Sequence, residues 1–415
     1  NNIFLLSATP AKNSPMEFYN LIQYMDPNIF RRYGIRTSGD FFQKFLEIEN
    51  DVFYTSTMNV QEYPQVKQFK NLDEFREILN RYANFQVLET ITEKYPEIAD
   101  KMQVPIPEPK RVEIEASEKQ MELISDILER MQLDPDDKEF INSLAGIMYM
   151  QMICISPLIY HQRDLFYVVD ETEENKVEED DKGKKPKATK KKSLTEIIKL
   201  IDKLPLRDLK SPKFNSLVEI IVGIRGNAKY KEGDTTCGNI VFIQNIAVQY
   251  MIKRLLIHAG VPEYSIGVMN AQVLKDPQSR QNVSKEFNFP STFHLDKANK
   301  IVASTARGAK EINGYRYDIL IANSVAYEGI DLQHRTCAIH HLDLAWEPAT
   351  ITQRNGRGVR SGNQYGSVGI YYYLISGSVD QYMFLTIQGK RNWLVSAVTS
   401  QDRVVNNVGA TETSA

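Results

Sequence analysis

"EPATITQRNGRGVRSGN", residues 347–363, concentrates arginine and glycine in one short segment of this chain. It places three arginines, Arg354, Arg357 and Arg360, at steps of three beside two glycines. A solvated helix face followed by a loop is one explanation for this pattern. A site that binds phosphate is the other explanation. The sequence on either side of this stretch has to show which of the two explanations holds.

Strands and helices alternate around this segment. Short apolar runs at residues 240–243, 318–322, 337–342 and 368–375 read as buried strands, and a helix with one apolar face follows the first of them. Such alternation predicts a parallel sheet that is covered by helices on both faces. We therefore expect an α/β fold over residues 211–400.

The first part of the chain, residues 1–104, predicts a strand, a turn and then helices. Ser14 can cap the first helix, Pro15 suits its first position, and Glu17 completes a capping box. The apolar stripe expected on that helix consists of Phe18, Leu21, Ile22 and Met25. Residues 31–100 are expected to be mostly helical and are rich in aromatic side chains.

A proline-marked segment, residues 104–117, predicts an extended crossing between two bodies. Ser117 and Gln120 form a second capping box, so a helix should follow, and a helical protrusion is expected over residues 105–210. The apolar stripe of the helix after Ser117 is expected to be Met121, Ile124, Leu128 and Met131.

Residues 170–192 change from an acidic run to a basic run with almost no apolar side chain, which predicts a disordered surface loop. Residues 401–415 are expected to be a disordered tail. Asp170 and Glu171 follow an apolar run and have the form of a magnesium-binding acidic pair. We favour a plain acidic loop there, because the pair leads directly into the charged segment.

The 415 residues are too many for one ordinary core, which predicts two domains or more. Hydrophobic residues make up 42% and charged residues 25%, as in a soluble globular protein, and no apolar run is long enough to span a membrane. The first residue is Asn1, so the sequence reads as a piece of a longer protein. The three cysteines are odd in number and form no C-x-x-C pair, which favours a reducing cytoplasm and argues against disulfides or a zinc site.

The formal net charge of −3 hides an asymmetry between the two parts of the chain. Residues 1–192 have a balance of −9, whereas residues 193–415 have a balance of +6. A basic second half is compatible with a polyanionic partner without requiring one.

If residues from Ala349 onward are helical, then Gln353, Arg357 and Arg360 fall on one stripe, at about 100° per residue. Arg354 then points elsewhere, and Gly356 and Gly358 leave the flank of the stripe bare. Two guanidinium groups on one stripe suit bidentate contact with phosphate oxygens.

The segment "QRNGRGVR" fits Q-x-x-G-R-x-x-R and resembles the sixth motif of superfamily-two helicases and translocases. This resemblance implies that Gln353, Arg357 and Arg360 act on ATP and that both arginines reach its γ-phosphate, with Gly356 beside them. "AYEGIDLQ", residues 326–333, resembles the fifth motif. There Gly329 would allow close approach to nucleic acid, and Asp331 would lie near the ribose of the nucleotide.

Two more segments resemble motifs of this family, in the family's order. "NIVFIQN", residues 239–245, resembles the fourth motif, with Gln244 and Asn245 at the carboxyl end of a strand, where open α/β sheets bind ligands. "LLSATPAKN", residues 5–13, resembles the third motif, which couples nucleotide state to lobe movement. The residues that carry it are Ser7, Ala8 and Thr9.

The sequence between the motifs is similar to that of the Swi/Snf-like branch, whose members translocate on double-stranded DNA. It is closest to large phage- or plasmid-borne DNA helicases, which are often fused to adenine methyltransferases. The resemblance covers residues 3–395, is poor at residues 289–316, which read as an insertion, and implies only the C-terminal half of such a protein. It implies a second RecA-like lobe over residues 211–400 and the tail of a first RecA-like lobe in residues 1–104.

The resemblance implies ATP with Mg²⁺ as cofactor and DNA, double-stranded, as partner. The chain contains no G-x-x-x-x-G-K-[ST] loop, so we expect a missing N-terminal lobe to bind most of the ATP and the chain alone to be inactive. A catalytically silent nucleic-acid-binding or scaffolding module is the alternative, and an RNA helicase is a weaker one. His340 and His341 are expected to be structural, and no metal site is expected within the chain.

Overall fold

The computed structural model describes residues 15–54, 60–84, 103–163, 193–226, 231–232, 235–326 and 329–398, together with residues 5 and 95. The chain divides into two compact units. The N-terminal unit comprises Asn1–Met102, Leu344–Thr352 and Val379–Ala415, and the sheet unit comprises Gln103–Asp343 and Gln353–Ser378. Ser7, Ala8, Thr9, Asp170, Glu171 and the charged segment 170–192 lie outside the described residues, as does the tail 401–415.

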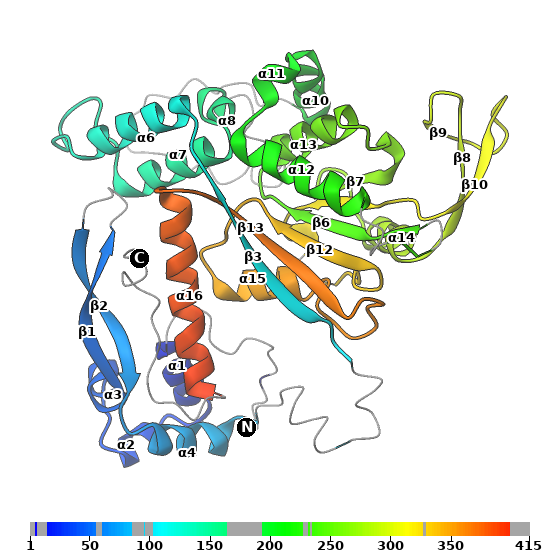
Figure 1. Ribbon diagram of the computed structural model, residues 1–415. Coiled ribbons are helices and arrows are strands. Elements are labelled where there is room, and N and C mark those ends of the chain that lie inside the picture. Colours follow the sequence, from blue (N-terminus) through cyan, green and yellow to red (C-terminus); the bar gives the residue numbers. More distant parts are fainter. Residues whose placement is uncertain are drawn as a thin grey trace, which may run out of the picture. The chain divides into compact units, whose positions relative to one another are not determined.

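The N-terminal unit combines helices with one antiparallel hairpin (Figure 1). Its elements are α1 (Met16–Met25), α2 (Ile29–Arg32), α3 (Ser38–Phe45), β1 (Leu46–Tyr54), β2 (Val60–Phe69), α4 (Leu72–Tyr82) and α16 (Val379–Val398). The expectation that residues 31–100 are mostly helical is therefore wrong over β1 and β2. Apolar and polar residues alternate from Leu46 to Glu49, which is the period of a strand and not of a helix.

Aromatic side chains fill the core of the N-terminal unit. The buried ring of Phe41 lies 5.2 Å from that of Tyr19, 5.7 Å from that of Phe30 and 5.7 Å from that of Phe75, between centroids. On α1, the expected stripe is confirmed at Phe18 and Ile22, which are buried, while Leu21 and Met25 are only half-buried. Pro15 is the N-cap of α1 instead of its first residue.

Six parallel strands form the sheet unit, in the order β3-β13-β12-β6-β11-β7 (Figure 1). They are β3 (Ile106–Ile114), β6 (Gly238–Phe242), β7 (Ile266–Met269), β11 (Ile319–Ala322), β12 (Thr336–His341) and β13 (Ser367–Ile375). Every pair of neighbours in this sheet is parallel. The expected α/β fold with a parallel sheet is confirmed.

Helices cover both faces of this sheet. On one face, Ile220 and Ile224 of α12 pack with Ala338 and Tyr371. On the other face, Asn355 of α15 hydrogen-bonds to side chains of β12 and β13. The helices of the described residues here are α6 (Glu118–Met131), α7 (Ser143–Ile155), α8 (Pro157–His161), α10 (Leu194–Lys203), α11 (Leu206–Leu209), α12 (Pro212–Gly226), α13 (Ile246–His258), α14 (Pro277–Asn288) and α15 (Pro348–Asn355), with 3-10 turns at Glu263–Ser265 and Ser324–Ala326.

The segment expected to cross between two bodies is extended, and its residues 106–114 form the edge strand β3 beside β13. The capping box of Ser117 and Gln120 at the start of α6 is confirmed. The apolar stripe expected on α6 is wrong at Met121, whose side chain is 55% exposed. Gln120 is buried in its place. The Gln120 side chain donates to the carbonyls of Ile153 and Cys154, which end α7.

The segment 289–316, expected to be an insertion, forms a sheet of its own. The strands β8 (Ser291–Leu295), β9 (Ile301–Val302) and β10 (Lys310–Gly314) are antiparallel, in the order β10-β8-β9. They project away from the six-stranded sheet at the side of β7 and α14 (Figure 1). A further short hairpin joins β4 (Lys231–Glu232) and β5 (Thr235–Thr236).

Candidate nucleotide and nucleic-acid site

The helix of the arginine stretch is shorter than the sequence predicts. It ends at Asn355, whose carbonyl accepts the amides of Gly358 at 3.0 Å and Val359 at 2.8 Å, and the chain then turns. Gly358 lies against β12, where a Cβ would be 2.6 Å from Cγ2 of Thr336. The single helical stripe is therefore wrong, and Gly358 serves the packing of a loop instead of clearing space beside a helix.

The turns nevertheless bring the two predicted arginines to the fifth-motif segment. Arg357 Nη1 donates to the carbonyl of Ile330 at 2.5 Å, and Arg360 Nη1 pairs with Oδ1 of Asp331 at 2.7 Å. Arg357 Nε also donates to the carbonyl of Gln353 at 3.4 Å. Four of the residues predicted to act on the nucleotide, Gln353, Arg357, Arg360 and Asp331, thus take part in these contacts, although the arginines do so from a loop.

Several hydrogen bonds hold these two loops together. Nδ1 of His334 donates to the carbonyl of Gly362 at 3.1 Å, and the amide of Gln364 donates to the carbonyl of His334 at 2.9 Å. Asn363 Nδ2 donates to the carbonyl of Thr336 at 2.8 Å. The loop that carries the arginines is therefore positioned before any ligand binds.

Two residues of α14 hydrogen-bond to the backbone of the fifth-motif segment and of His334 just after it. Ser284 Oγ and Asn288 Nδ2 both donate to the carbonyl of Asp331, at 2.5 Å and 2.6 Å, and Asn288 Oδ1 accepts the amide of His334 at 3.1 Å. Sequence reasoning missed Ser284, Asn288 and His334, because nothing in their spacing relates α14 to a loop more than 40 residues away.

Arg360 and Asp331 form an exposed ion pair, with side-chain exposures of 51% and 65%. Pairs this exposed contribute roughly 0–1 kcal/mol. A phosphate oxygen can therefore replace the carboxylate at little cost, so the Arg360 guanidinium is available to an anionic ligand.

Arg354, the first arginine of the stretch, has a different role. Its side chain is 3% exposed, and Nη1 donates to the carbonyl of Asp343 at 2.8 Å and pairs with the carboxylate at 3.0 Å. The other carboxylate oxygen of Asp343 accepts the amide of Gln244 at 2.6 Å. Arg354 points away from the other two arginines, as expected, and fixes the end of β6 to the end of β12.

Two of the residues predicted to contact nucleic acid, Gln244 and Asn245, lie beyond the carboxyl end of β6. Gln244 follows β6, and its Nε2 lies 3.5 Å from Oγ of Ser324, which follows β11. Asn245 caps α13, because its side-chain oxygen accepts the amide of Val248. Gly329 has φ +69°, a left-handed conformation that favours glycine.

The adjacent histidines project to opposite faces of β12 and are fully buried. Nδ1 of His340 lies 2.9 Å from the Tyr373 hydroxyl and Nε2 lies 3.2 Å from Oδ1 of Asn239, whereas Nε2 of His341 lies 2.7 Å from Oδ1 of Asn355. Burial lowers the pKa of both imidazoles to about 3, so both are neutral at physiological pH. These contacts are those of structural histidines.

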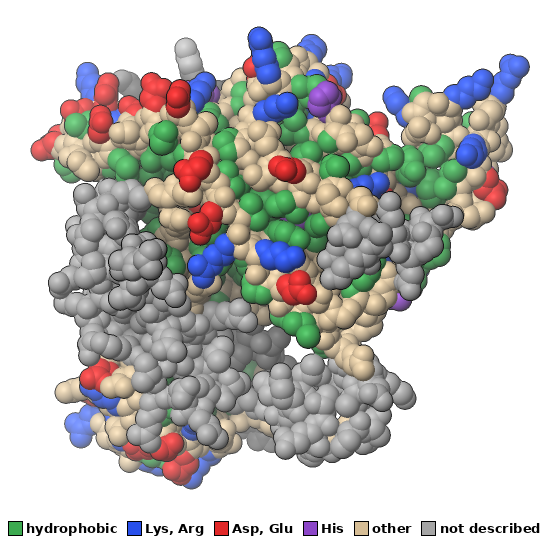
Figure 2. All heavy atoms as spheres, viewed as in Figure 1, with side chains coloured by type: hydrophobic (Ala, Val, Ile, Leu, Met, Phe, Trp, Pro, Cys, Tyr) green, Lys and Arg blue, Asp and Glu red, His purple; other side chains and the backbone are tan. Residues whose placement is uncertain are grey.

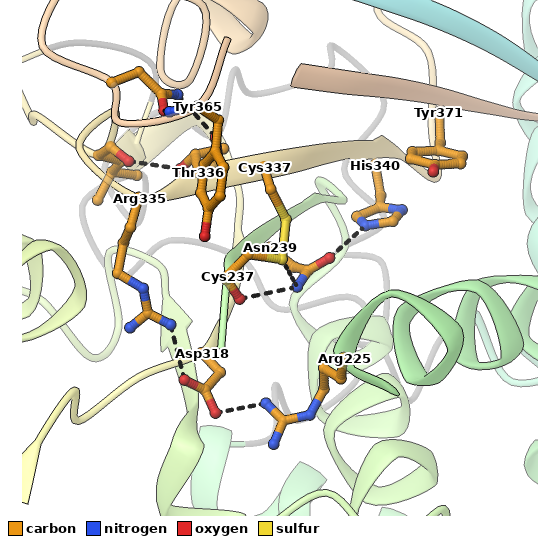
Figure 3. Close-up of a disulfide and its surroundings, with 12 residues drawn as sticks. Arg225, Cys237, Asn239, Asp318, Arg335, Thr336, Cys337, His340, Tyr365 and Tyr371 are labelled. Carbon is orange, nitrogen blue, oxygen red and sulfur yellow. Dashed lines mark hydrogen bonds and ion pairs between the residues drawn. A yellow bond between two sulfur atoms is a disulfide. The ribbon is translucent and has the colours of Figure 1, made fainter. Parts of the chain in front are cut away.

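The expectation of no disulfide is wrong. Cys237, just before β6, is bonded to Cys337 in β12, with Cα atoms 5.7 Å apart (Figure 3). The two strands are neighbours in the sheet, which brings together cysteines 100 residues apart. Figure 3 also shows Asp318 between Arg225 and Arg335, at 2.5 Å and 2.8 Å.

Within the part of the chain that the structure describes, no cluster of three or more His, Cys, Asp or Glu side chains could hold a metal ion. No helix among the same residues is long and apolar enough to cross a membrane.

One protein family matches part of this chain, and several known proteins are similar to it. The helicase conserved C-terminal domain matches residues 303–362, which include Asp331, Arg357 and Arg360. This chain is thus similar to helicase C-terminal domains over that segment. Most of the matched segment lies in the sheet unit.

The chain is also similar to "Defense against restriction protein B" of Escherichia phage P1, with 24% identity over 98% of this chain and 21% of that protein. The chain thus spans about a fifth of the length of this relative. The solved C-terminal part of the Fun30 ATPase domain has a TM-score of 0.44 and 14% identity, over 68% of this chain and 89% of that one. S. cerevisiae Dbp5 bound to RNA and ADP BeF3 has a TM-score of 0.30 and 17% identity, over 43% of this chain and 36% of that one.

Proposed function

We propose that this chain is the C-terminal motor half of an ATP-dependent DNA helicase or translocase of the Swi/Snf-like branch. The contact of Arg360 with Asp331, in a loop held by His334 and Gln364, is the observation that supports the proposal most directly. It provides a guanidinium that is positioned and weakly paired, as a group that reaches the γ-phosphate of ATP requires.

ATP with Mg²⁺ supplies the transferable phosphoryl group in such motors, and most of its binding requires a first lobe with a phosphate loop. In this chain, Arg360 would bind a phosphate oxygen in place of Asp331, while Arg357 holds the loop in place through the carbonyl of Ile330. The Asp331 carboxylate would then accept a hydrogen bond from the ribose. Gly356 lies in the same loop, Gln353 lies in the last turn of α15 just before it, and residues 1–104 would contribute the end of the first lobe.

DNA is the polymer along which we propose that the motor moves. The relative from phage P1 is named for defence against restriction, which is a process that acts on DNA, and residues 193–415 carry a balance of +6. We propose that Gln244, Asn245 and Gly329 face the DNA backbone, on duplex DNA in the bacterial cytoplasm. Binding through phosphates predicts weak sequence preference and a steep loss of affinity with salt.

The test joins this chain to a first lobe that carries a phosphate loop and a D-E-x-x box, and measures ATP hydrolysis with and without duplex DNA. We expect DNA-stimulated hydrolysis that Arg360→Ala lowers by about 10³-fold or more, with DNA affinity within a few-fold. Arg207→Ala is the matched control, since the Arg207 side chain is 87% exposed and lies far from the motifs in sequence.

Hydrolysis by the joined protein that Arg360→Ala leaves intact would refute the role of Arg360 as a γ-phosphate sensor. DNA binding without any hydrolysis in the joined protein would favour a silent nucleic-acid-binding module instead. Stimulation by RNA in place of DNA would favour an RNA helicase.

A further inference from the structure

A cavity of about 400 Å³ lies at the β7 edge of the six-stranded sheet, at the base of the insertion. β7 supplies one wall through Ile266–Val268, and the turn between β8 and β9 supplies another through residues 299–301. In the sheet order, β6 and β11 separate this edge from β12, on which the arginine loop packs. The cavity is therefore distinct from the proposed ATP site.

The lining of this cavity is cationic. Lys253, Lys300 and Arg316 contribute three positive charges, and Glu263, which pairs with Lys253 at 3.2 Å, contributes the single negative charge. Figure 2 shows Lys and Arg side chains along the projecting insertion, where Lys300 lies with other exposed cations. The net positive charge favours an anionic ligand.

Arg316 has no ion-pair partner among the described residues, and its Nη1 is buried without a hydrogen-bond partner there. Aromatic rings hold it instead, with its guanidinium carbon 4.6 Å from the ring centroid of Tyr317, 5.8 Å from that of Phe293 and 6.0 Å from that of Tyr264. Stacking fixes a guanidinium in place while leaving its donors unused. Such a group is suited to bind phosphate.

Three tyrosines, Tyr250, Tyr264 and Tyr317, line the same cavity. Gly267 of β7 lets the Tyr317 ring approach the strand, because a Cβ on Gly267 would lie 3.1 Å from that ring. Burial raises the pKa of Tyr250 and Tyr317, so both hydroxyls stay neutral and can donate hydrogen bonds at physiological pH. Aromatic walls beside cations suit a flat ring that carries a phosphate.

We infer that this cavity binds a nucleoside 5′-phosphate, either as a free nucleotide or as the 5′-phosphorylated end of a DNA strand. Arg316 and Lys300 bind the phosphate, and the tyrosines contact the base. The volume is at the lower end of the range for small-ligand sites and admits one nucleotide unit. Because the insertion supplies one wall, the site is a feature of this chain and not of the helicase fold.

The experiment measures binding of three probes to the full 415-residue chain by calorimetry: adenosine 5′-monophosphate, a short 5′-phosphorylated DNA strand, and the same strand without the phosphate. Lys300→Glu is compared with Lys297→Glu. Both lysines are exposed on the same turn, but only Lys300 lines the cavity. Arg360→Ala is included in every arm, so that binding at the proposed ATP site is recognised.

We expect Lys300→Glu to weaken binding of a phosphate-bearing probe by about ten-fold or more, and Lys297→Glu and Arg360→Ala to change it little. Preference for the phosphorylated strand over adenosine 5′-monophosphate identifies a DNA end as the ligand, and the reverse identifies a free nucleotide. Equal effects of the two lysine variants, or no binding of either phosphorylated probe, would overturn the inference. Loss of binding in Arg360→Ala alone would assign the binding to the motor site and also overturn it.

Discussion

Arg354 and Arg360 are six residues apart in one arginine motif, and their surroundings predict opposite consequences of mutation. We expect Arg354→Met to lower the free energy of unfolding of the sheet unit strongly, although methionine keeps most of the apolar stem. The reason is that it leaves the Asp343 carboxylate, which is 16% exposed, without its cation.

The magnitude follows from the contacts. Removing one partner of a buried ion pair costs about 3–5 kcal/mol, and the stack of the Arg354 guanidinium on Phe242, at 5.4 Å, adds about 0.5–1 kcal/mol. Asp343 keeps the Gln244 amide and some solvent, which places the ion-pair part near the lower limit. We therefore expect a loss of about 3–4 kcal/mol.

The assay is urea denaturation followed by circular dichroism, with separate transitions fitted where the two units unfold separately. Arg360→Ala and Arg207→Ala are the controls, and each should change the free energy of unfolding by less than about 1 kcal/mol because both side chains are exposed. Adding Asp343→Asn to Arg354→Met should recover part of the loss, since the amide oxygen still accepts the Gln244 N–H but carries no charge. A loss below about 1 kcal/mol for Arg354→Met, or no recovery in the double variant, would refute this reasoning.

Three further predictions concern the same sheet. Cys337→Ala should lower the free energy of unfolding by about 2–4 kcal/mol, because the disulfide closes a long loop, and a thiol titration of the denatured wild-type chain should find one free thiol; three would contradict the disulfide. His340 and His341 have folded-state pKa values lowered to about 3, so unfolding takes up protons below pH 6.5; stability should be complete above that pH and fall by up to about 1.4 kcal/mol per pH unit per histidine as the pH drops toward 3. We expect the urea midpoint of the wild-type chain to fall as the pH drops from 6.5 toward 3, and the midpoint of His341→Gln to fall much less. An equal fall in both would contradict the assignment of His341 as a buried neutral imidazole. Gly358→Ala should displace the arginine loop from Thr336 and lower the ATPase turnover of the joined protein about ten-fold or more while DNA affinity stays within a few-fold; full activity would show that the contact is dispensable.

Features that depend on neighbouring residues could be predicted from the amino-acid sequence. Short apolar runs that alternate with helices predicted the parallel sheet, because a strand that is buried on both faces is apolar along its whole length. The capping box at Ser117 predicted the start of α6, because both partners lie within one turn of helix. The motif spacing predicted that Arg357, Arg360 and Asp331 act together, since the family resemblance carries information that local pattern does not.

The contacts between distant segments could not be predicted in this way, because they depend on the folded chain. The helix end at Asn355 depends on the packing of Gly358 against Thr336, so the helical stripe drawn from spacing alone was wrong. Cys237 and Cys337 are neighbours only because β6 and β12 pair, and no local pattern marks residues 100 positions apart. The sequence separated Arg354 from Arg357 and Arg360, but it could not predict that Arg354 is buried against Asp343, because that burial is a property of the folded sheet.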